Sequence, residues 1–194
     1  LPEVKAEVIQ ETAPVMIPEP VLVNYDDTVY KVERKTFANT NEHAAVIDSK
    51  GNIIFEKDGD ANSVMFTDRE LETMKGNTLT HNHPGGWKFK NYEPQYAGNS
   101  FSPDDIKLAT KMNAFEIRAT TPKYIFSMKP GKSGWPNRED MLNSIINKYY
   151  TEVREEFLKK LSKNIISPQE AEAEHWHEVN IRIAKHYKLL YTRI

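Results

Sequence analysis

The stretch Leu79-Thr80-His81-Asn82-His83-Pro84, followed by Ser102-Pro103-Asp104-Asp105, places two imidazoles and a carboxylate in an order that suits a divalent metal ion. Residues 78–81 are typical of a short strand, and side chains two apart on a strand project to the same side, so both rings could reach one ion. Ser102 precedes a proline that suits the first helical position, which makes its hydroxyl the expected helix cap. Asp105 then lies in the first helical turn and would supply the third ligand.

Zinc is the cofactor that this ligand set predicts. A catalytic zinc ion takes three protein ligands and keeps a fourth position for water, and His81, His83 and Asp105 satisfy that count. The chain contains no cysteine, which excludes a disulfide framework, thiolate zinc sites and the cysteine-ligated zinc deaminases. Asp104 lies in the same helical turn and is the alternative ligand, although the S-x-x-D spacing favours Asp105 and leaves Asp104 at a solvated helix start.

Hydrolysis by a metal-activated water also needs a carboxylate that moves a proton. The best candidate is Glu42, which opens an apolar run over residues 43–48 that predicts a strand; a turn at 49–52 and a second strand at 53–55 complete a hairpin. Glu33 and Glu56 compete with Glu42 for the role of base. His43 follows Glu42 in the strand and so points to the opposite side, which favours packing over catalysis.

A glutamate at a strand start, H-x-H-P at a strand end and S-x-x-D at a helix start together resemble the JAMM (MPN-plus) metalloprotease family. The stretch 42–52 with His81-Asn82-His83-Pro84 is most similar to the RadC-like bacterial branch, and the resemblance covers roughly residues 42–106. It implies an α/β fold, the cytidine-deaminase-like sandwich with a central mixed sheet and flanking helices. It also implies zinc ligation by His81, His83 and Asp105, general-base catalysis by Glu42, and donation from Ser102 to the tetrahedral oxyanion.

The chain departs from the family pattern between the histidines and the serine. The family usually has a link of six or seven residues there, whereas residues 85–101 intervene in this chain. The glycines and proline of residues 85–101 predict a loop. A loop tolerates insertion at a slowly growing entropic cost, and this one could form a lid over the cleft. Within it, Trp87-Lys88-Phe89-Lys90-Asn91-Tyr92 interleaves aromatic and basic side chains. That pattern could stack on nucleic-acid bases, but it favours a loop anchored by its aromatic residues.

A second resemblance concerns context. The order of residues 81–86, 100–106 and 177–193 is similar to the C-terminal domains attached to phage head-morphogenesis (Mu F-like or portal-associated) proteins. This implies a phage- or prophage-encoded module with phage head or portal proteins as candidate partners. A start at Leu1 without a methionine agrees with a fragment of a larger polypeptide.

Composition sets the remaining bounds. The chain has 194 residues, 39% of them hydrophobic and 28% charged, which predicts a soluble globular protein with one domain. No apolar run approaches the ~20 residues that cross a bilayer, so no membrane partner is expected. The formal net charge of −2 supplies no global basic field for nucleic-acid binding. No signal peptide is visible, and a cytoplasmic or virion-associated location is expected.

Periodicity and capping patterns give the expected organisation. Four prolines within residues 1–24 predict an extended N-terminal arm, and residues 25–194 are expected to form the metallohydrolase domain. Further strands are expected at 28–37, 63–66, 116–119, 123–128 and 187–194. Helices are expected from Thr67 to near Gly76, at 102–113, at 141–161 as a long amphipathic helix, and at 167–186.

His175-Trp176-His177 is the other histidine pair. On a helix, residues two apart face different directions, so these rings are expected to pack separately instead of sharing an ion, and His186 has no ligand partner at useful spacing.

The predicted function is therefore a zinc-dependent metallohydrolase that cleaves a peptide or isopeptide bond in a protein or peptide substrate. The alternatives are a non-enzymatic phage head-assembly module with the same fold, and a nuclease-associated or nucleic-acid-binding factor.

Overall fold

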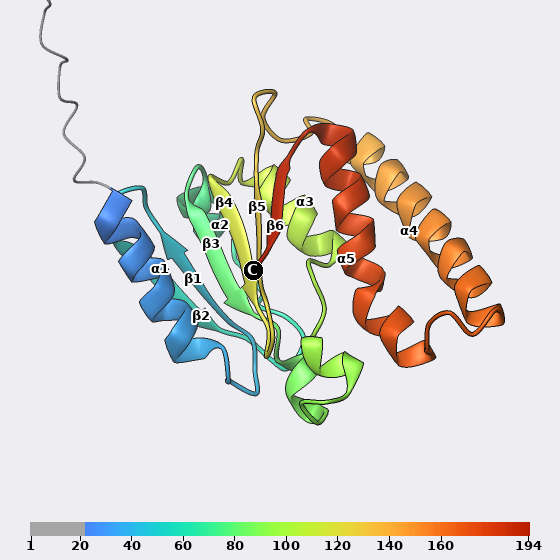
Figure 1. Cartoon of the computed structure of the whole chain (residues 1–194). Coiled ribbons are helices and arrows are strands. Elements are labelled where there is room, and N and C mark those ends of the chain that lie inside the picture. The colour runs from blue at the N-terminus through green and yellow to red at the C-terminus, as the bar shows by residue number, and fades with distance from the viewer. Residues whose placement is uncertain (1–21) are drawn as a thin grey trace, which may run out of the picture.

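The hairpin at residues 43–58 begins a six-stranded sheet with the strand order β2-β1-β3-β4-β5-β6 (Figure 1). The structure is a computed structural model that describes residues 22–194. Only β3 and β4 pair in parallel, so the sheet is mixed. The strands are β1 His43–Ile47, β2 Ile53–Asp58, β3 Thr78–Asn82, β4 Glu116–Thr120, β5 Ile125–Lys129 and β6 Leu190–Arg193.

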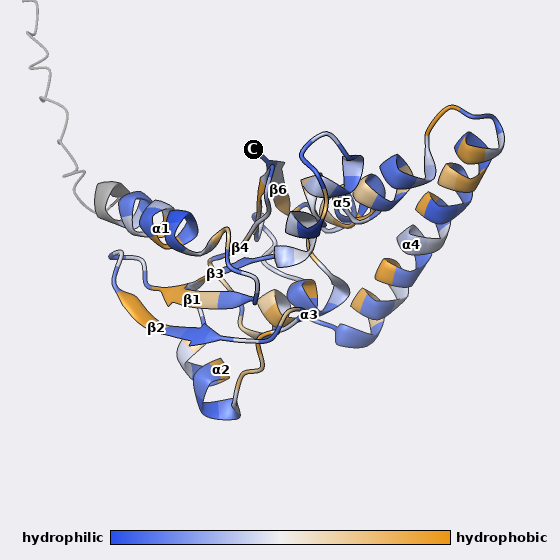
Figure 2. Cartoon of the chain, turned by 90° about the horizontal axis from the view of Figure 1, so that it is seen from below, coloured by the Kyte–Doolittle hydropathy of each residue, from blue (hydrophilic) through white to orange (hydrophobic). Residues whose placement is uncertain are grey.

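Five α-helices in the described chain flank this sheet, which confirms the mixed α/β class. They are α1 Leu22–Thr36, α2 Asp68–Met74, α3 Pro103–Lys111, α4 Glu139–Ser162 and α5 Pro168–Tyr187. Two short 3₁₀ helices, η1 Pro84–Lys88 and η2 Pro94–Ala97, lie in the long loop after β3. Helix α1 covers one face of the sheet, while α2 and α3 lie on the other (Figure 2). Helix α4 packs on α5, away from the sheet (Figure 1).

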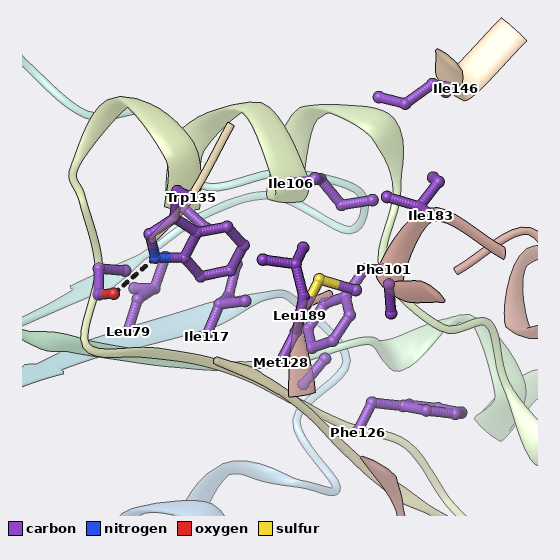
Figure 3. Packing of buried hydrophobic residues seen from close by; sticks show 14 of the residues in the cluster. Leu79, Phe101, Ile106, Ile117, Phe126, Met128, Trp135, Ile146, Ile183 and Leu189 are labelled. Carbon is purple, nitrogen blue, oxygen red and sulfur yellow. Dashed lines mark hydrogen bonds between the residues drawn. The ribbon is translucent and has the colours of Figure 1, made fainter. Parts of the chain in front are cut away.

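Side-chain alternation along the strands divides the interior into two cores. Ala45 and Ile47 of β1 pack with Tyr25, Val29 and Val32 of α1 in the smaller core. The intervening positions of β1 face the larger core, which joins the opposite face of the sheet to α3 and α5. Figure 3 shows that larger core, with the Trp135 indole donating to the Ala114 carbonyl oxygen at 2.7 Å. The larger core fixes the end of β3 against the start of α3.

A buried polar network joins α1 to the sheet. The Arg118 guanidinium donates to the Glu33 carboxylate at 2.6 and 3.1 Å and to Glu116 at 2.8 Å. The hydroxyl of Tyr25 donates to Glu116 at 2.8 Å, and the hydroxyl of Thr80 donates to Glu33 at 3.0 Å. These charges are buried but paired, so they fix the position of α1.

The predictions of strands at residues 28–37 and 63–66 are wrong. Residues 28–36 form most of α1, because Tyr25, Val29, Val32 and Thr36 recur every three or four positions and are buried, whereas Tyr30 is 55% exposed. Residues 63–66 form no strand; the amide of Asp60 donates to the carbonyl of Ser63 in a turn, and the segment then runs on as irregular chain.

The expected N-terminal arm lies mainly outside the described residues. Its last part, residues 22–24, belongs to α1 and is helical, not extended. The remaining helices and strands agree with their predicted ranges within a few residues, although Tyr187 ends α5 and does not begin β6. None of the helices between residues 22 and 194 has the length and apolarity needed to cross a bilayer.

Candidate metal centre

His81 lies near the end of β3, on the face of the sheet that carries the larger core. It pairs with Ala44 of β1 and Ala119 of β4, and its side chain is 5% exposed. His83 follows the strand, but its amide donates to the carbonyl of Thr120 at 2.7 Å, which keeps the chain extended. The predicted consequence of H-x-H spacing is confirmed, since both rings lie on one side.

The two histidines and Asp105 converge. The Nε2 atoms of His81 and His83 are 2.8 Å apart, and the carboxylate of Asp105 lies 3.2 Å from His81 Nε2 and 3.6 Å from His83 Nε2. Ligand bonds of about 2.0–2.2 Å in a tetrahedron place ligand atoms roughly 3.3–3.6 Å apart, so the two carboxylate distances are close to those around a bound ion, while the two imidazole nitrogens lie closer together. The three side chains could therefore hold a metal ion.

Asp105 reaches this point from the first turn of α3. A capping box fixes it: the amide and hydroxyl of Ser102 donate to Asp105 Oδ2 at 2.7 and 2.8 Å, and the Asp105 amide donates back to Ser102 Oγ at 3.2 Å. The other carboxylate oxygen, Oδ1, faces His81. Asp104 instead pairs with Lys107 at 3.2 Å, and its side chain is 92% exposed. The structure thus brings Asp105, and not Asp104, to the histidines.

In the metal-free site, Asp105 and His83 hold each other in their charged forms. Burial acts to raise the pKa of Asp105, but the charges and hydrogen bonds of His81 and His83 hold that pKa well below its usual range. Burial acts to lower the pKa of His83, yet the hydrogen bond and charge of Asp105 raise it to about 9. The carboxylate is therefore ionised at neutral pH. The Nδ1–H of His83 can donate to the Asn99 carbonyl oxygen at 2.9 Å, which directs Nε2 to the other candidate ligands, and a metal bound there would displace the Nε2 proton.

Glu42 lines a cleft that is also lined by His81, His83 and Asp105. It precedes β1, and backbone hydrogen bonds to Gly59 and Asp60 fix its position. Burial raises the pKa of its carboxyl, while the neighbouring His81 and His83 act to lower it. A carboxyl of raised pKa is suited to accepting and releasing a proton near neutral pH.

The competing carboxylates lie elsewhere. Glu33 is in α1, on the opposite face of the sheet, and pairs with Arg118. Glu56 on β2 contacts His43 at 3.2 Å and Lys35 at 3.4 Å, also on the α1 side. Neither lines the cleft. His43 therefore points away from Glu42, as expected, and contacts carboxylates of β2.

The cleft has a volume of about 380 Å³ and is lined by polar and apolar residues. The polar residues include Glu42, the three candidate ligands and Ser102. The apolar wall includes Val64, Met65, Phe66, Leu108 and Trp176. Sequence reasoning missed this wall and the carbonyl of Asn99, because no local pattern indicates which loop residues meet around a distant site.

The long loop after His83 borders the cleft with its two ends, Pro84–Gly85 and Asn99–Ser100. Its middle is anchored elsewhere: the indole of Trp87 donates to the Phe37 carbonyl oxygen at 2.8 Å and packs edge-on against Phe37 and Tyr96. This agrees with the favoured interpretation of the aromatic residues, and Trp87 does not line the cleft as part of a lid.

His175 and His177 do not share a site. The ring of His175 packs against Tyr150 at 4.7 Å, whereas His177 Nδ1 lies 2.8 Å from the Tyr191 hydroxyl. His186 contacts Tyr149 at 3.2 Å. Within residues 22–194, the group formed by His81, His83 and Asp105 is the one whose ligand atoms lie close enough to share an ion.

No protein-family model matches this chain, and no curated protein or solved structure matches it either. The function must therefore be argued from the geometry and chemistry of the site itself.

Proposed function

We propose that this chain is a zinc-dependent metallohydrolase that cleaves a peptide or isopeptide bond. The observation that carries the proposal is the convergence of His81, His83 and Asp105 at the end of a cleft that also holds the carboxyl of Glu42. Three ligands and a proton acceptor in one cleft are the components of metal-assisted hydrolysis.

The donor set favours zinc. Two imidazole nitrogens and one carboxylate oxygen match the three-ligand sets of catalytic zinc sites, and hard-cation sites for Mg²⁺ or Ca²⁺ use oxygen ligands. His81 and His83 would bind through Nε2, and Asp105 through the oxygen that the Ser102 cap leaves free. When bound there, zinc supplies a water of lowered pKa and polarises the scissile carbonyl.

The chain itself would then move the proton. Glu42 accepts a proton from the attacking water as the new carbon–oxygen bond forms, and it delivers that proton to the amine nitrogen as the carbon–nitrogen bond breaks. Its raised pKa suits both steps. The cleft's apolar wall would contact the side chains that flank the scissile bond.

Ser102 is proposed as the donor to the oxyanion, by its resemblance to the JAMM serine. It lines the cleft, but its hydroxyl donates to Asp105 Oδ2 at 2.8 Å. Its hydrogen bonds therefore support a role in orienting the aspartate ligand, and the oxyanion role stays a prediction.

The JAMM-like identity of the fold is part of the same proposal. It is supported by the order of the parts: a glutamate before β1, H-x-H at the end of β3 and S-x-x-D at the start of α3, around a mixed sheet. A phage or prophage origin, and head or portal proteins as partners, rest on the sequence resemblance alone.

The test combines metal analysis with turnover. The purified chain should carry about one zinc ion, and His81→Ala and Asp105→Ala should lose it. Fluorescence-quenched peptides and a ubiquitin-like conjugate are then supplied as substrates. Glu42→Gln should retain zinc and reduce turnover at least about 100-fold, because general acid–base catalysis contributes that much or more.

Glu56→Gln is the matched control, since it removes a carboxylate of the same hairpin on the opposite face. It should retain full turnover. Equal turnover by Glu42→Gln and the parent would dismiss Glu42 as the base. A folded chain that takes up no zinc would instead favour the non-enzymatic assembly module.

A further inference from the structure

The segment Asn99–Ser102 touches two of the three candidate metal ligands. The carbonyl oxygen of Asn99 lies 2.9 Å from His83 Nδ1. The amide and hydroxyl of Ser102 donate to Asp105 Oδ2 at 2.7 and 2.8 Å. This short segment therefore sets the direction of one imidazole and one carboxylate, and whatever holds it in place also determines how the metal ligands point.

Helix α5 holds the middle of the segment. The side-chain amide of Asn180, which is fully buried, donates to Ser100 Oγ at 3.0 Å and to the carbonyl oxygen of Phe101 at 2.9 Å. A buried amide that bonds two successive residues fixes both the backbone and the side-chain orientation of a loop. Asn180 thus links a helix some 80 positions later in the chain to the segment beside the metal centre.

Strand β6 supplies a second anchor. The hydroxyl of Tyr191 lies 2.7 Å from Ser100 Oγ and 2.8 Å from His177 Nδ1. Burial, together with the charge of Arg193, lowers the pKa of His177 to about 4, so the ring is neutral at pH 7. If its Nδ1 is unprotonated, Asn180 donates to Ser100, Ser100 to Tyr191, and Tyr191 to His177. The two hydroxyls and His177 Nδ1 then all have partners in this series of hydrogen bonds.

Aromatic packing fixes the same segment. Phe101 is fully buried and contacts the rings of Phe126 and Tyr191, with centroid distances of 6.4 and 6.2 Å. Phe126 and Tyr191 stack with an angle of 6° between their planes. Figure 3 shows Phe101 and Phe126 among the buried side chains of the larger core. The hydroxyl of Tyr191 is therefore held by its ring as well as by its hydrogen bonds.

We propose that Ser100, Asn180 and Tyr191 are positioning residues that orient the metal ligands His83 and Asp105 through the segment Asn99–Ser102. The proposal rests on the metal site of the proposed function, but not on hydrolysis. It gives α5 and β6 a defined role, because they hold the loop that carries the contacts to the ligands (Figure 1). Removing a group that contacts a metal ligand directly typically changes metal affinity about 10- to 100-fold, and these three side chains act one contact further out.

The test uses the full chain and the metal alone. Tyr191→Phe and Ser100→Ala each remove one hydroxyl of the network. Zinc affinity is measured by competition with a chromophoric chelator, and the geometry of the site is followed by the absorption spectrum of the Co²⁺-substituted chain. Both variants should bind zinc more weakly than the parent, by up to about tenfold, and should show an altered Co²⁺ spectrum.

Tyr149→Phe is the matched control. It also removes a tyrosine hydroxyl that contacts a histidine Nδ1, His186 at 3.2 Å, but at an exposed position between α4 and α5. It should bind zinc and Co²⁺ as the parent does. The thermal midpoint of each metal-free variant shows whether the fold is retained, and Ser100→Ala tests the network separately if Tyr191→Phe fails to fold.

The outcomes separate the two proposals. Parent-like zinc affinity and Co²⁺ spectra in both folded variants overturn the positioning role and leave the hydrolase standing. Weakened zinc binding in a chain that cleaves no peptide supports the positioning role and contradicts the hydrolase. A parent chain that takes up no metal overturns both.

Discussion

Side-chain alternation along β3 decides which residues can reach the candidate metal centre. Thr78 and Thr80 face α1, where they contact Tyr25 and Glu33, whereas Leu79 and His81 face the larger core and the cleft. A register slip of one residue would move the imidazole to the α1 face. The convergence of the two histidines could therefore be predicted from their spacing alone.

His177 gives a prediction about acid stability. The ring is buried between Phe126 and Tyr191, with Arg193 of β6 and Glu174 of α5 as its charged neighbours, and its pKa is lowered to about 4, mainly by burial. The unfolded chain binds a proton at this position near pH 6.5, whereas the folded chain does so only near pH 4. The contribution of the neutral ring is complete above pH 6.5 and is lost as the pH falls toward 4.

Urea unfolding of the metal-free chain at pH 7 and 4.5 tests this. His177→Gln keeps a hydrogen-bonding side chain for Tyr191 but cannot titrate. The parent should lose more stability than the variant over this range, by up to about 1.4 kcal/mol for each pH unit. Both chains contain the same carboxylates, so the effect of protonating them on stability cancels in the comparison. Identical losses in both would show that His177 is not held neutral by the fold.

The contacts of Asn99, Asn180 and Tyr191 could not be predicted in this way. Each joins residues 14 to 91 positions apart in the chain, as in the bonds from His177 to Tyr191 and from Ser100 to Tyr191. Their residue types are common in loops, helices and strands that serve no site. The candidate ligands could be predicted because the H-x-H and S-x-x-D patterns are each local, whereas the residues proposed to orient them come close only through packing.

At the scale of elements, local capping chemistry explains which helices the sequence reveals. Thr67, Ser102 and Ser167 each form a capping box with the acidic residue three positions later, and all three helices begin where this pattern predicts. Helix α1 lacks an acidic first turn, and its apolar positions lie among charged ones. The Arg118 network holds it in place instead. The local pattern of residues 28–37 therefore predicts a strand where the structure has a helix.

Two of these capping boxes provide a matched pair. Ser102→Ala and Ser167→Ala remove the same cap from α3 and α5, and each should cost about 1 kcal/mol in urea unfolding of the metal-free chain. Only Ser102 also orients a candidate ligand, so only Ser102→Ala should weaken zinc binding, by about tenfold. Equal zinc affinities for the two variants would contradict the role of Ser102 in orienting Asp105.

The attachment of α1 gives another prediction at this scale. Glu33→Gln removes the charge that pairs with Arg118, and breaking a buried ion pair from one side should cost roughly 3 kcal/mol of unfolding free energy. Glu156→Gln breaks the exposed pair with Arg182 and should cost at most about 1 kcal/mol. Urea denaturation measures both. Similar costs for the two variants would mean that the α1 network contributes no more than a surface pair.

At the scale of the whole molecule, the candidate metal centre joins parts of the chain that are distant in sequence. Two candidate ligands lie at and just after the end of β3 and the third in α3, while the long loop between them contacts Phe37, just after α1, through Trp87 and contacts α5 through η2. The two faces of the sheet differ in what they contain. The α1 face carries the smaller core and the Arg118 network, and the opposite face combines the larger core with the cleft.

Because the ligands belong to separate elements, an ion bound between them should stabilise the whole fold. The midpoint of thermal unfolding should rise with zinc concentration. At a concentration about 100-fold above the dissociation constant the gain is about 2.7 kcal/mol, or roughly 5–10 °C for a chain of this size. Differential scanning fluorimetry across a zinc titration measures the shift. His81→Ala should abolish it, since it removes the ligand at the centre of the 2.8 and 3.2 Å contacts, whereas Glu42→Gln should preserve it because Glu42 is not a ligand. A shift that survives in His81→Ala would place the stabilising ion somewhere other than the end of β3.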